Sequence, residues 1–532
     1  MITRLLLLAA ILAPNVTFAR APAELPTLEV RTRSVNDLLT AADYLASLVG
    51  QEEAAKQFRG FLAALATEKE GLEGLDLSRP FGAYAFVKPD VVDSPFVVFI
   101  PVANEARFLQ MLKDRLDYVN DPKDGLHSWP IPRVKESVHF RFTEGYACVS
   151  LRRVALDSEP MLKPRAFFAK DDSCVASAIL RIDHLPDEFK RMLLGQVELR
   201  LQDGRVQQAQ RESPVEKQIR ALLLDSLLAS FRTVLDDGKD LSLRLRIEPS
   251  TDDIALETRL TAKPNSTLAK SMSDAGSVTS LPAAIAARER PTIAIAAKAS
   301  VPMSYLVPYH EALDSLWLDL LTKTPEESRE LVKRVGESIL PTLKAGTLDV
   351  AIAFQNQGRP GLRAAIKVAD SKPLLEILKS LTLFVPSSVA TFAFDRETIH
   401  GFALHRIELK SLSNAEVKRL GSRVLWLATS KEHIAMSLED EAQPLKKALE
   451  AKPIASPILA VSLGLSKLIA ATETALPSDR IAVLVTQVFG EGPLADRDRI
   501  QLTITGGQAF DVRLAAKGKA IKLGVVIDQA KK

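Results

Sequence analysis

The chain has 532 residues, 47% of them hydrophobic and 25% charged, which is enough apolar material for several buried cores. Its 69 basic and 66 acidic side chains nearly cancel and are mixed along the chain. Nucleic-acid-binding proteins instead carry a basic stripe interleaved with aromatic residues, so the composition argues against a nucleic-acid partner.

The N-terminus has the pattern of a secretory signal peptide. Arg4 gives the start a positive charge, residues 5–14 form a short apolar stretch, and cleavage can follow Ala19 or, alternatively, Ala21. The apolar stretch is too short to cross a bilayer, and no later stretch approaches the roughly 18 apolar residues needed. We expect residues 1–19 to be removed, leaving an exported protein, periplasmic or extracellular, without a transmembrane segment. An uncleaved N-terminal anchor is the alternative.

One pattern then occurs four times along the chain: an alternating apolar strand runs into a helix start whose first two apolar residues are four apart. These pairs are Val35/Leu39, Leu185/Phe189, Val301/Tyr305 and Leu465/Ile469. After each start come a second helix and two alternating strands, and in three copies a short helix follows. The sequence therefore predicts about four copies of a β-α-α-β-β-α module.

The strand pairs of these modules are separated by short, turn-rich connectors. The predicted pairs are 81–88 with 95–102, 241–248 with 254–261, 347–354 with 362–368, and 500–505 with 510–515. Their alternation predicts largely antiparallel sheets with one buried face, which we expect the helical hairpins to cover. The predicted fold class is α+β, and a closed barrel is disfavoured because helices interrupt the strands too often.

The spacing of the module starts predicts two equivalent halves. Val35 and Val301 are separated by nearly the same number of residues as Leu185 and Leu465. Between the halves lies a stretch rich in serine, glycine and proline, as is typical of a linker. The predicted organisation is a signal peptide at 1–19, a first half at 20–270, a linker at 271–290 and a second half at 291–532.

Two helix starts carry the residues of a capping box. The segments 213–216 (Ser-Pro-Val-Glu) and 324–327 (Thr-Pro-Glu-Glu) each offer a hydroxyl for the N-cap, a proline for the first helical position and a glutamate three residues after the cap. We expect a helix to begin at each of them.

The two cysteines, Cys148 and Cys174, both fall on predicted strands. An exported protein meets an oxidising compartment, where disulfides persist. A bridge would close a loop of about 26 residues and add roughly 3 kcal/mol of stability. The alternative is that both act as small buried hydrophobic residues, so a disulfide between them is a possibility that the sequence leaves open.

Catalytic and cofactor motifs are missing. The seven histidines are dispersed, and the nearest pair, His400 and His405, is separated by an odd number of residues, which sends them to opposite faces of a strand. The chain has no metal-ligand spacing, no phosphate-binding glycine loop and no nucleophile motif. We therefore expect no metal and no cofactor, and no catalytic residue can be named.

Two functions remain open on this basis. The first is a non-enzymatic binding or structural protein of the bacterial cell envelope, whose partner is an envelope protein, a glycan or a lipid. The apolar runs 222–228 and 313–321 could line a pocket for such a ligand, or could simply pack on their own sheets. The second is an envelope hydrolase with a site at the junction of the halves, because domain interfaces often hold pockets.

Three strand-and-turn segments also carry a likeness to known sequences: 74–82 (Gly-Leu-Asp-Leu-Ser-Arg-Pro-Phe-Gly), 97–102 (Val-Val-Phe-Ile-Pro-Val) and 260–264 (Leu-Thr-Ala-Lys-Pro). Through them the chain resembles a set of secreted, signal-peptide-bearing proteins from planctomycete-type bacteria. The resemblance supports the architecture and implies no activity.

Overall fold

The computed structural model forms two compact units. Unit 1 comprises Met1–Gln196 and Val234–Ser266, and unit 2 comprises Val197–Thr233 and Thr267–Lys532. The described residues are 25–51, 53, 74–90, 93–116, 118–119, 122–130, 136–157, 161–169, 174–208, 214–276, 278–301, 305–355, 361–472, 478–491 and 497–531. The predicted signal peptide lies outside them. None of the helices within these ranges combines the length and the apolarity that a membrane span requires.

Unit 1 is built on one antiparallel sheet. Among its described residues the strands lie in the order β9-β8-β7-β1-β2-β3-β6-β5-β4. Their bounds are β1 (Leu28–Thr32), β2 (Phe81–Ala85), β3 (Phe96–Pro101), β4 (His127–Pro130), β5 (Ser137–Thr143), β6 (Tyr146–Ser150), β7 (Ala176–Arg181), β8 (Gly238–Glu248) and β9 (Asp253–Ala262). The helices are α2 (Val35–Val49), α4 (Glu105–Leu116), η2 (Arg153–Leu156), α5 (Pro164–Phe167) and η3 (Ile182–His184). The long helices α6 (Asp187–Gln208) and α7 (Pro214–Asp237) run from unit 1 into unit 2 and back.

Local chemistry accounts for the first helix of unit 1. The Ser34 hydroxyl accepts a hydrogen bond from the backbone N–H of Asp37 and so caps the N-terminus of α2. Gly50 ends the helix in the left-handed conformation, with φ of 70°. Both features lie in the first predicted module, where the sequence places a helix start at Val35.

Unit 2 is also built on one antiparallel sheet. Among its described residues the strands lie in the order β21-β20-β19-β11-β12-β13-β17-β16-β15-β14, and β10 pairs with β18 separately. The strand bounds are β10 (Thr279–Ser280), β11 (Ile293–Ser300), β12 (Thr347–Gln355), β13 (Gly361–Lys367), β14 (Ala390–Ile399), β15 (Phe402–Leu409), β16 (Val424–Thr429), β17 (His433–Leu438), β18 (Ile454–Ala455), β19 (Leu459–Gly464), β20 (Arg499–Thr505) and β21 (Ala509–Lys517). The helices are α8 (Thr267–Gly276), α9 (Leu281–Ala286), α10 (Leu306–Lys323), α11 (Glu326–Lys344), α12 (Lys372–Leu381), α13 (Asn414–Leu420), α14 (Gln443–Leu449), α15 (Leu465–Thr472), α16 (Ser478–Phe489) and α17 (Gly518–Lys531).

One buried cluster of unit 2 lies on one side of its sheet, and a second is formed by α15, α16 and α17. Ile285 of α9 and Leu445 of α14 are fully buried in a cluster with Ala365 of β13. Ala365 pairs with Ala351 of the neighbouring strand, so both point toward α9. Ile352, the next residue along β12, points to the opposite side of the sheet.

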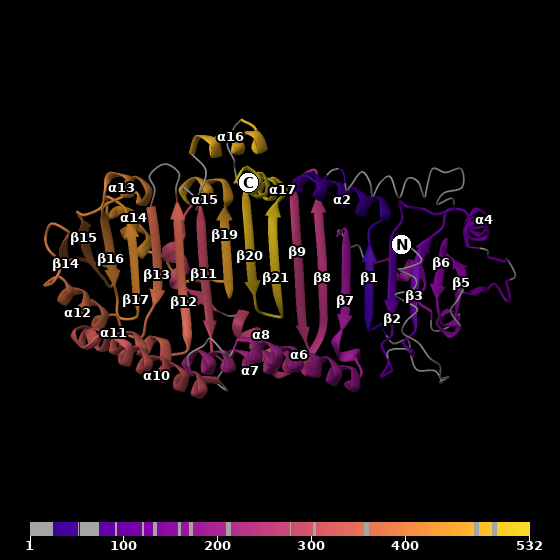
Figure 1. The fold of residues 1–532 in the computed structure, drawn as a ribbon, viewed down its shortest axis with the longest axis horizontal. Helices are drawn as coiled ribbons and strands as arrows, with labels where there is room; N and C mark the ends of the chain where they lie inside the picture. The colour runs from indigo at the N-terminus through magenta and orange to yellow at the C-terminus, as the bar shows by residue number, and fades with distance from the viewer. Residues whose placement is uncertain are drawn as a thin grey trace. The chain divides into compact units, whose positions relative to one another are not determined.

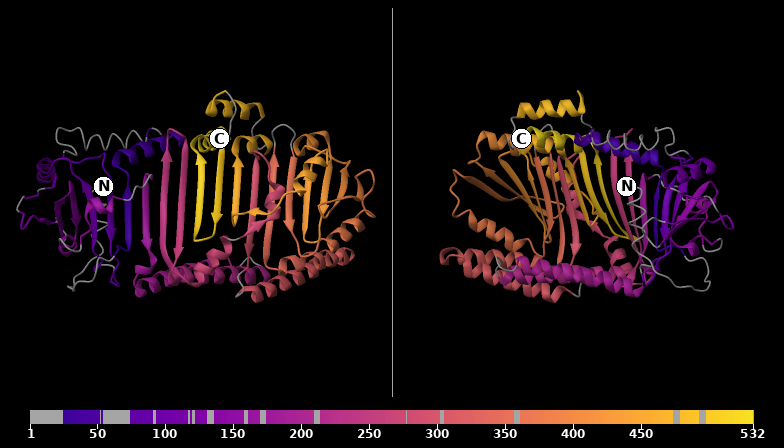
Figure 2. Two further views of the ribbon diagram at one scale, coloured as in Figure 1. Left: turned by 180° about the vertical axis from the view of Figure 1, so that it is seen from behind. Right: turned by 45° about the vertical axis from the view of Figure 1, so that its right-hand side comes forward.

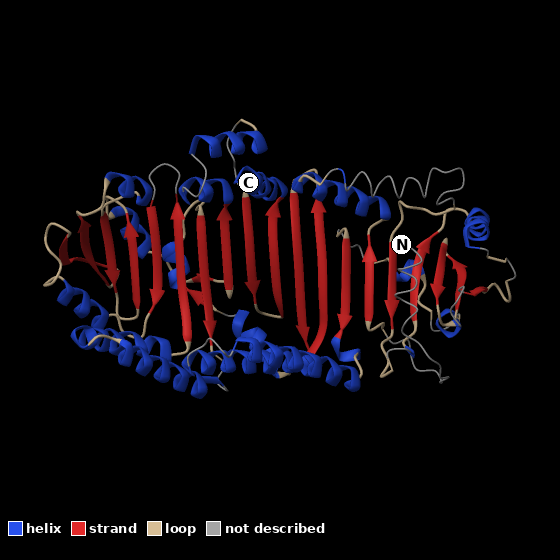
Figure 3. Ribbon diagram, viewed as in Figure 1, coloured by secondary structure: helices blue, strands red, loops and turns tan. Residues whose placement is uncertain are grey.

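The longer helices of unit 2 lie at the ends of the strands rather than across this opposite side. Figures 1 and 3 show α10 and α11 along one end of the unit 2 strands and α15 and α17 along the other end, and the turned view in Figure 2 agrees. Only Ala345 and Gly346 connect α11 to β12. The prediction that helical hairpins cover the apolar sheet face is therefore wrong for unit 2.

The four predicted strand pairs are confirmed as β2–β3, β8–β9, β12–β13 and β20–β21, and all are antiparallel. The predicted capping box at 324–327 is wrong. The helix begins at Glu326 after Pro325, and the Thr324 hydroxyl instead donates to the carbonyl oxygen of Leu320 in the preceding helix. The other predicted capping serine, Ser213, lies outside the described residues. Residues 271–290, expected as a linker, hold the end of α8, β10 and all of α9.

Candidate functional site

The most unusual surface of unit 2 is the sheet face that α9 does not cover. Residues paired across an antiparallel ladder point to the same side, so the register of β12, β11, β19, β20 and β21 defines rows of side chains on this face. The middle row is Ile352, Ile295, Val461, Leu502 and Leu514. The rows on either side are Phe354, Ile293, Leu463, Ile500 and Ala516, and Val350, Ala297, Leu459, Ile504 and Val512. We call these fifteen residues the unit 2 apolar face.

None of these fifteen side chains is buried. The exposed fraction is 36% for Ile295, 37% for Ile352 and 45% for Leu514. Ala351 and Ala353, which alternate with them on β12, are 3% exposed. Unit 2 thus buries small side chains under α9 and leaves large aliphatic ones uncovered, the reverse of the usual arrangement in a sheet with one solvated face.

The sheet of unit 1 has a corresponding surface on β2, β1, β7, β8 and β9. Its rows are Ala83, Val30, Ala178, Leu243 and Thr258, then Ala85, Leu28, Leu180, Leu241 and Leu260, and then Phe81, Thr32, Ala176, Leu245 and Leu256. None of these side chains is buried; Leu243 is 44% exposed. We call this set the unit 1 apolar face.

Charged side chains of unit 1 lie on the other side of the same strands. Glu29 of β1 accepts hydrogen bonds from the guanidinium groups of Arg31 and Arg181, and all three residues are buried. The Arg31 guanidinium also lies 4.5 Å from the centre of the Phe167 ring. These ion pairs and the aromatic core occupy one face, so the other face is left without charge.

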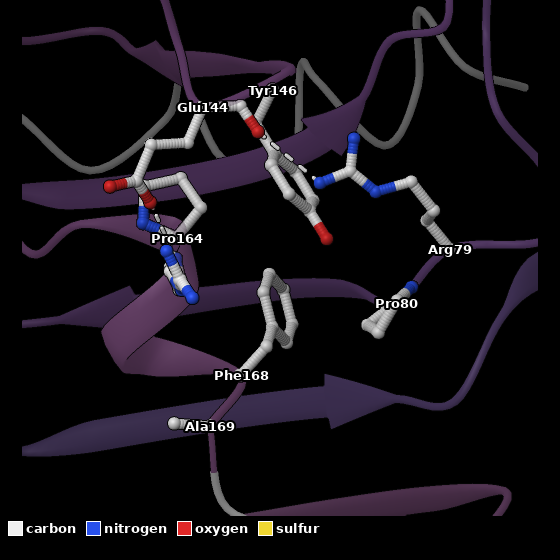
Figure 4. Close-up of a pocket in the computed structure, with 8 residues that line it drawn as sticks. Arg79, Pro80, Glu144, Tyr146, Pro164, Phe168 and Ala169 are labelled. Atoms are coloured by element: carbon white, nitrogen blue, oxygen red, sulfur yellow. Dashed lines mark hydrogen bonds between the residues drawn. The ribbon is translucent and has the colours of Figure 1, made fainter.

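A pocket of about 660 Å³ lies on the same side of the unit 1 sheet as the Phe167 ring, opposite to the unit 1 apolar face (Figure 4). Its lining residues are Arg79, Pro80, Glu144, Tyr146, Pro164, Arg165, Phe168 and Ala169. The β5–β6 turn supplies Glu144 in the left-handed conformation, with φ of 53°, followed by Gly145 with φ of 75°. In Figure 4 the rings of Tyr146 and Phe168 lie between Arg79 on one side and Glu144 with Pro164 on the other.

The structure places the sequence-predicted residues as follows. Cys148 lies on β6 and Cys174 just before β7; both are buried and are not joined in a disulfide. Burial raises the pKa of Cys148 to about 12. The runs 222–228 and 313–321 lie on α7 and α10, where Leu223 and Leu318 remain exposed.

Two contacts between a hydroxyl and a histidine bear on the hydrolase alternative. The His405 Nε2 atom lies 3.0 Å from Thr429 Oγ1, but His405 is fully buried, and burial lowers its pKa. The Ser128 Oγ atom lies 2.9 Å from His139 Nδ1 on the neighbouring strand; Ser128 is exposed and His139 is half-buried. Within the described ranges no cluster of histidine, cysteine and carboxylate side chains could hold a metal ion.

The fold itself is a mixed α+β architecture with large antiparallel sheets. No protein-family model matches the chain, and neither a curated protein nor a solved structure matches it. The two apolar faces and the unit 1 pocket are therefore the features from which a function must be argued.

Proposed function

We propose that this chain is an exported, non-enzymatic binding protein of the bacterial cell envelope whose sheets hold the acyl chains of a lipid. The observation that carries the proposal is the unit 2 apolar face, fifteen apolar positions on five adjacent strands with no charged or hydrogen-bonding side chain among them. Contiguous exposed apolar patches larger than a few hundred Å² mark interaction sites.

The chemistry of the face favours hydrocarbon over protein as its occupant. Protein interfaces carry about one hydrogen bond per 100–200 Å² and are enriched in arginine and tyrosine. The unit 2 apolar face supplies neither residue type, and the backbone groups of its strands are already engaged in the ladder. An acyl chain needs no polar partner.

The dimensions agree with this assignment. Adjacent strands lie about 4.8 Å apart, so a row across five strands measures about 19 Å. One leaflet of a bilayer has a hydrocarbon depth of about 15 Å, half of the roughly 30 Å core. A hydrocarbon chain that spans one leaflet can therefore lie along one row of these five strands.

We further propose that the two units are copies of one fold and that each carries such a face. The strand order β9-β8-β7-β1-β2-β3-β6-β5-β4 corresponds to β21-β20-β19-β11-β12-β13-β17-β16-β15 when the strands are taken in chain order, with β14 added at the far edge. The apolar faces occupy corresponding strands in both units. This correspondence supports the two equivalent halves predicted from the sequence, and the predicted signal peptide supports export.

The test is binding of a dansyl-labelled fatty acid to delipidated mature protein. Leu514→Asp places a carboxylate on the unit 2 apolar face, and Leu383→Asp places the same charge on a leucine that is 83% exposed in the turn after α12. We expect the first variant to lose affinity at unit 2 at least tenfold, because a charge would lie against hydrocarbon. The second should bind like the parent protein. Equal binding by all three proteins, or no binding by the parent, would contradict the proposal.

The alternative, an envelope hydrolase, has one observation in its favour, the contact between the exposed Ser128 and the half-buried His139. A neutral histidine can act as general base to a serine, and burial lowers the pKa of His139. Hydrolysis of a panel of ester and amide substrates that disappears in Ser128→Ala would support this alternative. Activity that survives the substitution would count against it.

A further inference from the structure

We propose that the unit 1 pocket is a second binding site, for an organic anion whose carboxylate or phosphate group is attached to a flat apolar body. The pocket is separate from the acyl-chain surface. The Phe168 ring packs close to the Cα of Gly82 on the side of β2 opposite to Ala83, which belongs to the unit 1 apolar face. The inference therefore does not rest on lipid binding.

Arg79 provides a cation that is already fixed in place. Its guanidinium donates to the carbonyl oxygen of Gly145 at 3.1 Å and to that of Glu144 at 3.2 Å. It also lies 4.3 Å from the centre of the Tyr146 ring. These contacts use only part of the five N–H donors of the group. Since the side chain is already ordered, a ligand that accepts from the remaining donors loses less entropy on binding.

Arg165 provides the second cation, and its side chain is exposed. Its backbone N–H donates to the Glu144 carboxylate at 2.8 Å, but no acidic side chain among the described residues pairs with its exposed guanidinium. The lining thus carries two positive charges against one negative charge. Asp76 is outside the lining and accepts from the Ser78 hydroxyl at 2.5 Å. This hydrogen bond and the nearby charge of Arg79 lower the pKa of Asp76, so Asp76 offsets part of the Arg79 charge. Within the lining the two arginines outnumber the one carboxylate, and the exposed guanidinium of Arg165 favours an anion.

The rest of the lining is flat and apolar. The rings of Tyr146 and Phe168 stack with their centres 5.3 Å apart and their planes 21° apart, and Pro80 and Pro164 lie beside them. A volume of about 660 Å³ is within the roughly 300–1,000 Å³ of small-molecule sites. Arginine guanidinium groups bind carboxylate and phosphate through paired hydrogen bonds. The lining therefore selects for a ring or similar flat group that bears one of these anions.

The experiment uses naphthoate, naphthyl phosphate and the uncharged naphthalenemethanol, titrated calorimetrically into the mature protein. Arg165→Ala removes the exposed guanidinium and should lower the affinity for the anions at least tenfold. Arg165→Lys should restore it only in part, because a lysine cannot bind in the paired manner. The matched control is Arg107→Ala, an exposed arginine on α4, which should bind like the parent protein.

A preference for naphthoate or for naphthyl phosphate identifies the anion class, and either preference supports the site. The proposal is overturned if neither anion binds, if Arg165→Ala binds as the parent does, or if the uncharged probe binds equally well. Leu514→Asp should leave these affinities unchanged, so a failure of lipid binding and a failure of this site are separate results.

Discussion

The uncovered apolar face predicts that the same substitution has very different consequences on the two sides of the unit 2 sheet. Leu445→Ala and Leu514→Ala both shorten a leucine in unit 2. Leu445 is fully buried in the cluster with Ile285, and Leu514 is 45% exposed on the apolar face. The comparison tests whether the face is open to solvent in the protein without ligand.

The expected magnitudes follow from burial. Truncation of a fully buried leucine costs about 2–5 kcal/mol, because a cavity is added to the lost transfer free energy. Full burial of a leucine contributes about 1.5–3 kcal/mol; roughly half of that is present at Leu514, and the space vacated there opens to solvent. Leu514→Ala should therefore lower the free energy of unfolding by about 1 kcal/mol, and Leu445→Ala by at least twice as much.

The assay is urea unfolding of delipidated mature protein, followed by circular dichroism at 25 °C. A chain with two compact units can unfold in more than one step, so the two variants are compared on the transition that Leu445→Ala shifts. A loss for Leu514→Ala as large as that for Leu445→Ala would refute the reasoning, because it would mean that protein covers the face in solution.

Four further outcomes are expected. Gly336→Ala should lower the melting temperature despite the better helix propensity of alanine, because the added Cβ would lie 1.8 Å from the Trp317 ring; unchanged melting would show that the two helices can move apart. Burial lowers the pKa of His405 below 6.5, so the unfolded chain takes up the proton first and stability should fall as the pH drops below about 6.5. His405→Gln should flatten that pH dependence. With its pKa raised to about 12, Cys148 should resist thiol reagents at pH 8 until the protein unfolds, and rapid labelling of the native protein at this residue would contradict its burial. The intact mass of the exported protein should correspond to cleavage after Ala19.

Several strand pairings could be predicted because their signals are local. In β8 and β9, leucine alternates with polar residues on both sides of a short turn, and this pattern is enough to specify an antiparallel pair. Ser34 and Gly50 similarly mark the two ends of α2 through hydrogen bonds within a few residues.

The sequence could not tell which face of a strand would be covered. Alternation separates Ile352 from Ala351 on β12 but does not say where the helices go, and the usual expectation places them on the large aliphatic side chains. The run of alanines on the other side of β11 and β12 was the available signal, because small side chains permit the close approach of α9. The prediction at Thr324 was wrong because this residue lies between the end of α10 and the start of α11. Its hydroxyl donates to the Leu320 carbonyl oxygen of α10 and does not cap α11.

The unit 1 pocket was beyond prediction because its parts come from three separated segments. Arg79, Glu144 and Arg165 meet only when β2, the β5–β6 turn and α5 pack around the aromatic core. None of them belongs to a motif.

The arrangement of side chains on the unit 2 sheet is easier to explain by binding than by folding. The packed core lies under α9 and α14, so polar side chains at Ile295 or Leu514 would leave that core intact and would reduce the risk of aggregation. On the proposed function, these fifteen apolar residues in register on five strands serve a contact with an acyl chain. If each unit contributes one such face, the chain should hold acyl chains at two sites, and loss of one face by substitution should halve the amount of lipid bound rather than abolish binding.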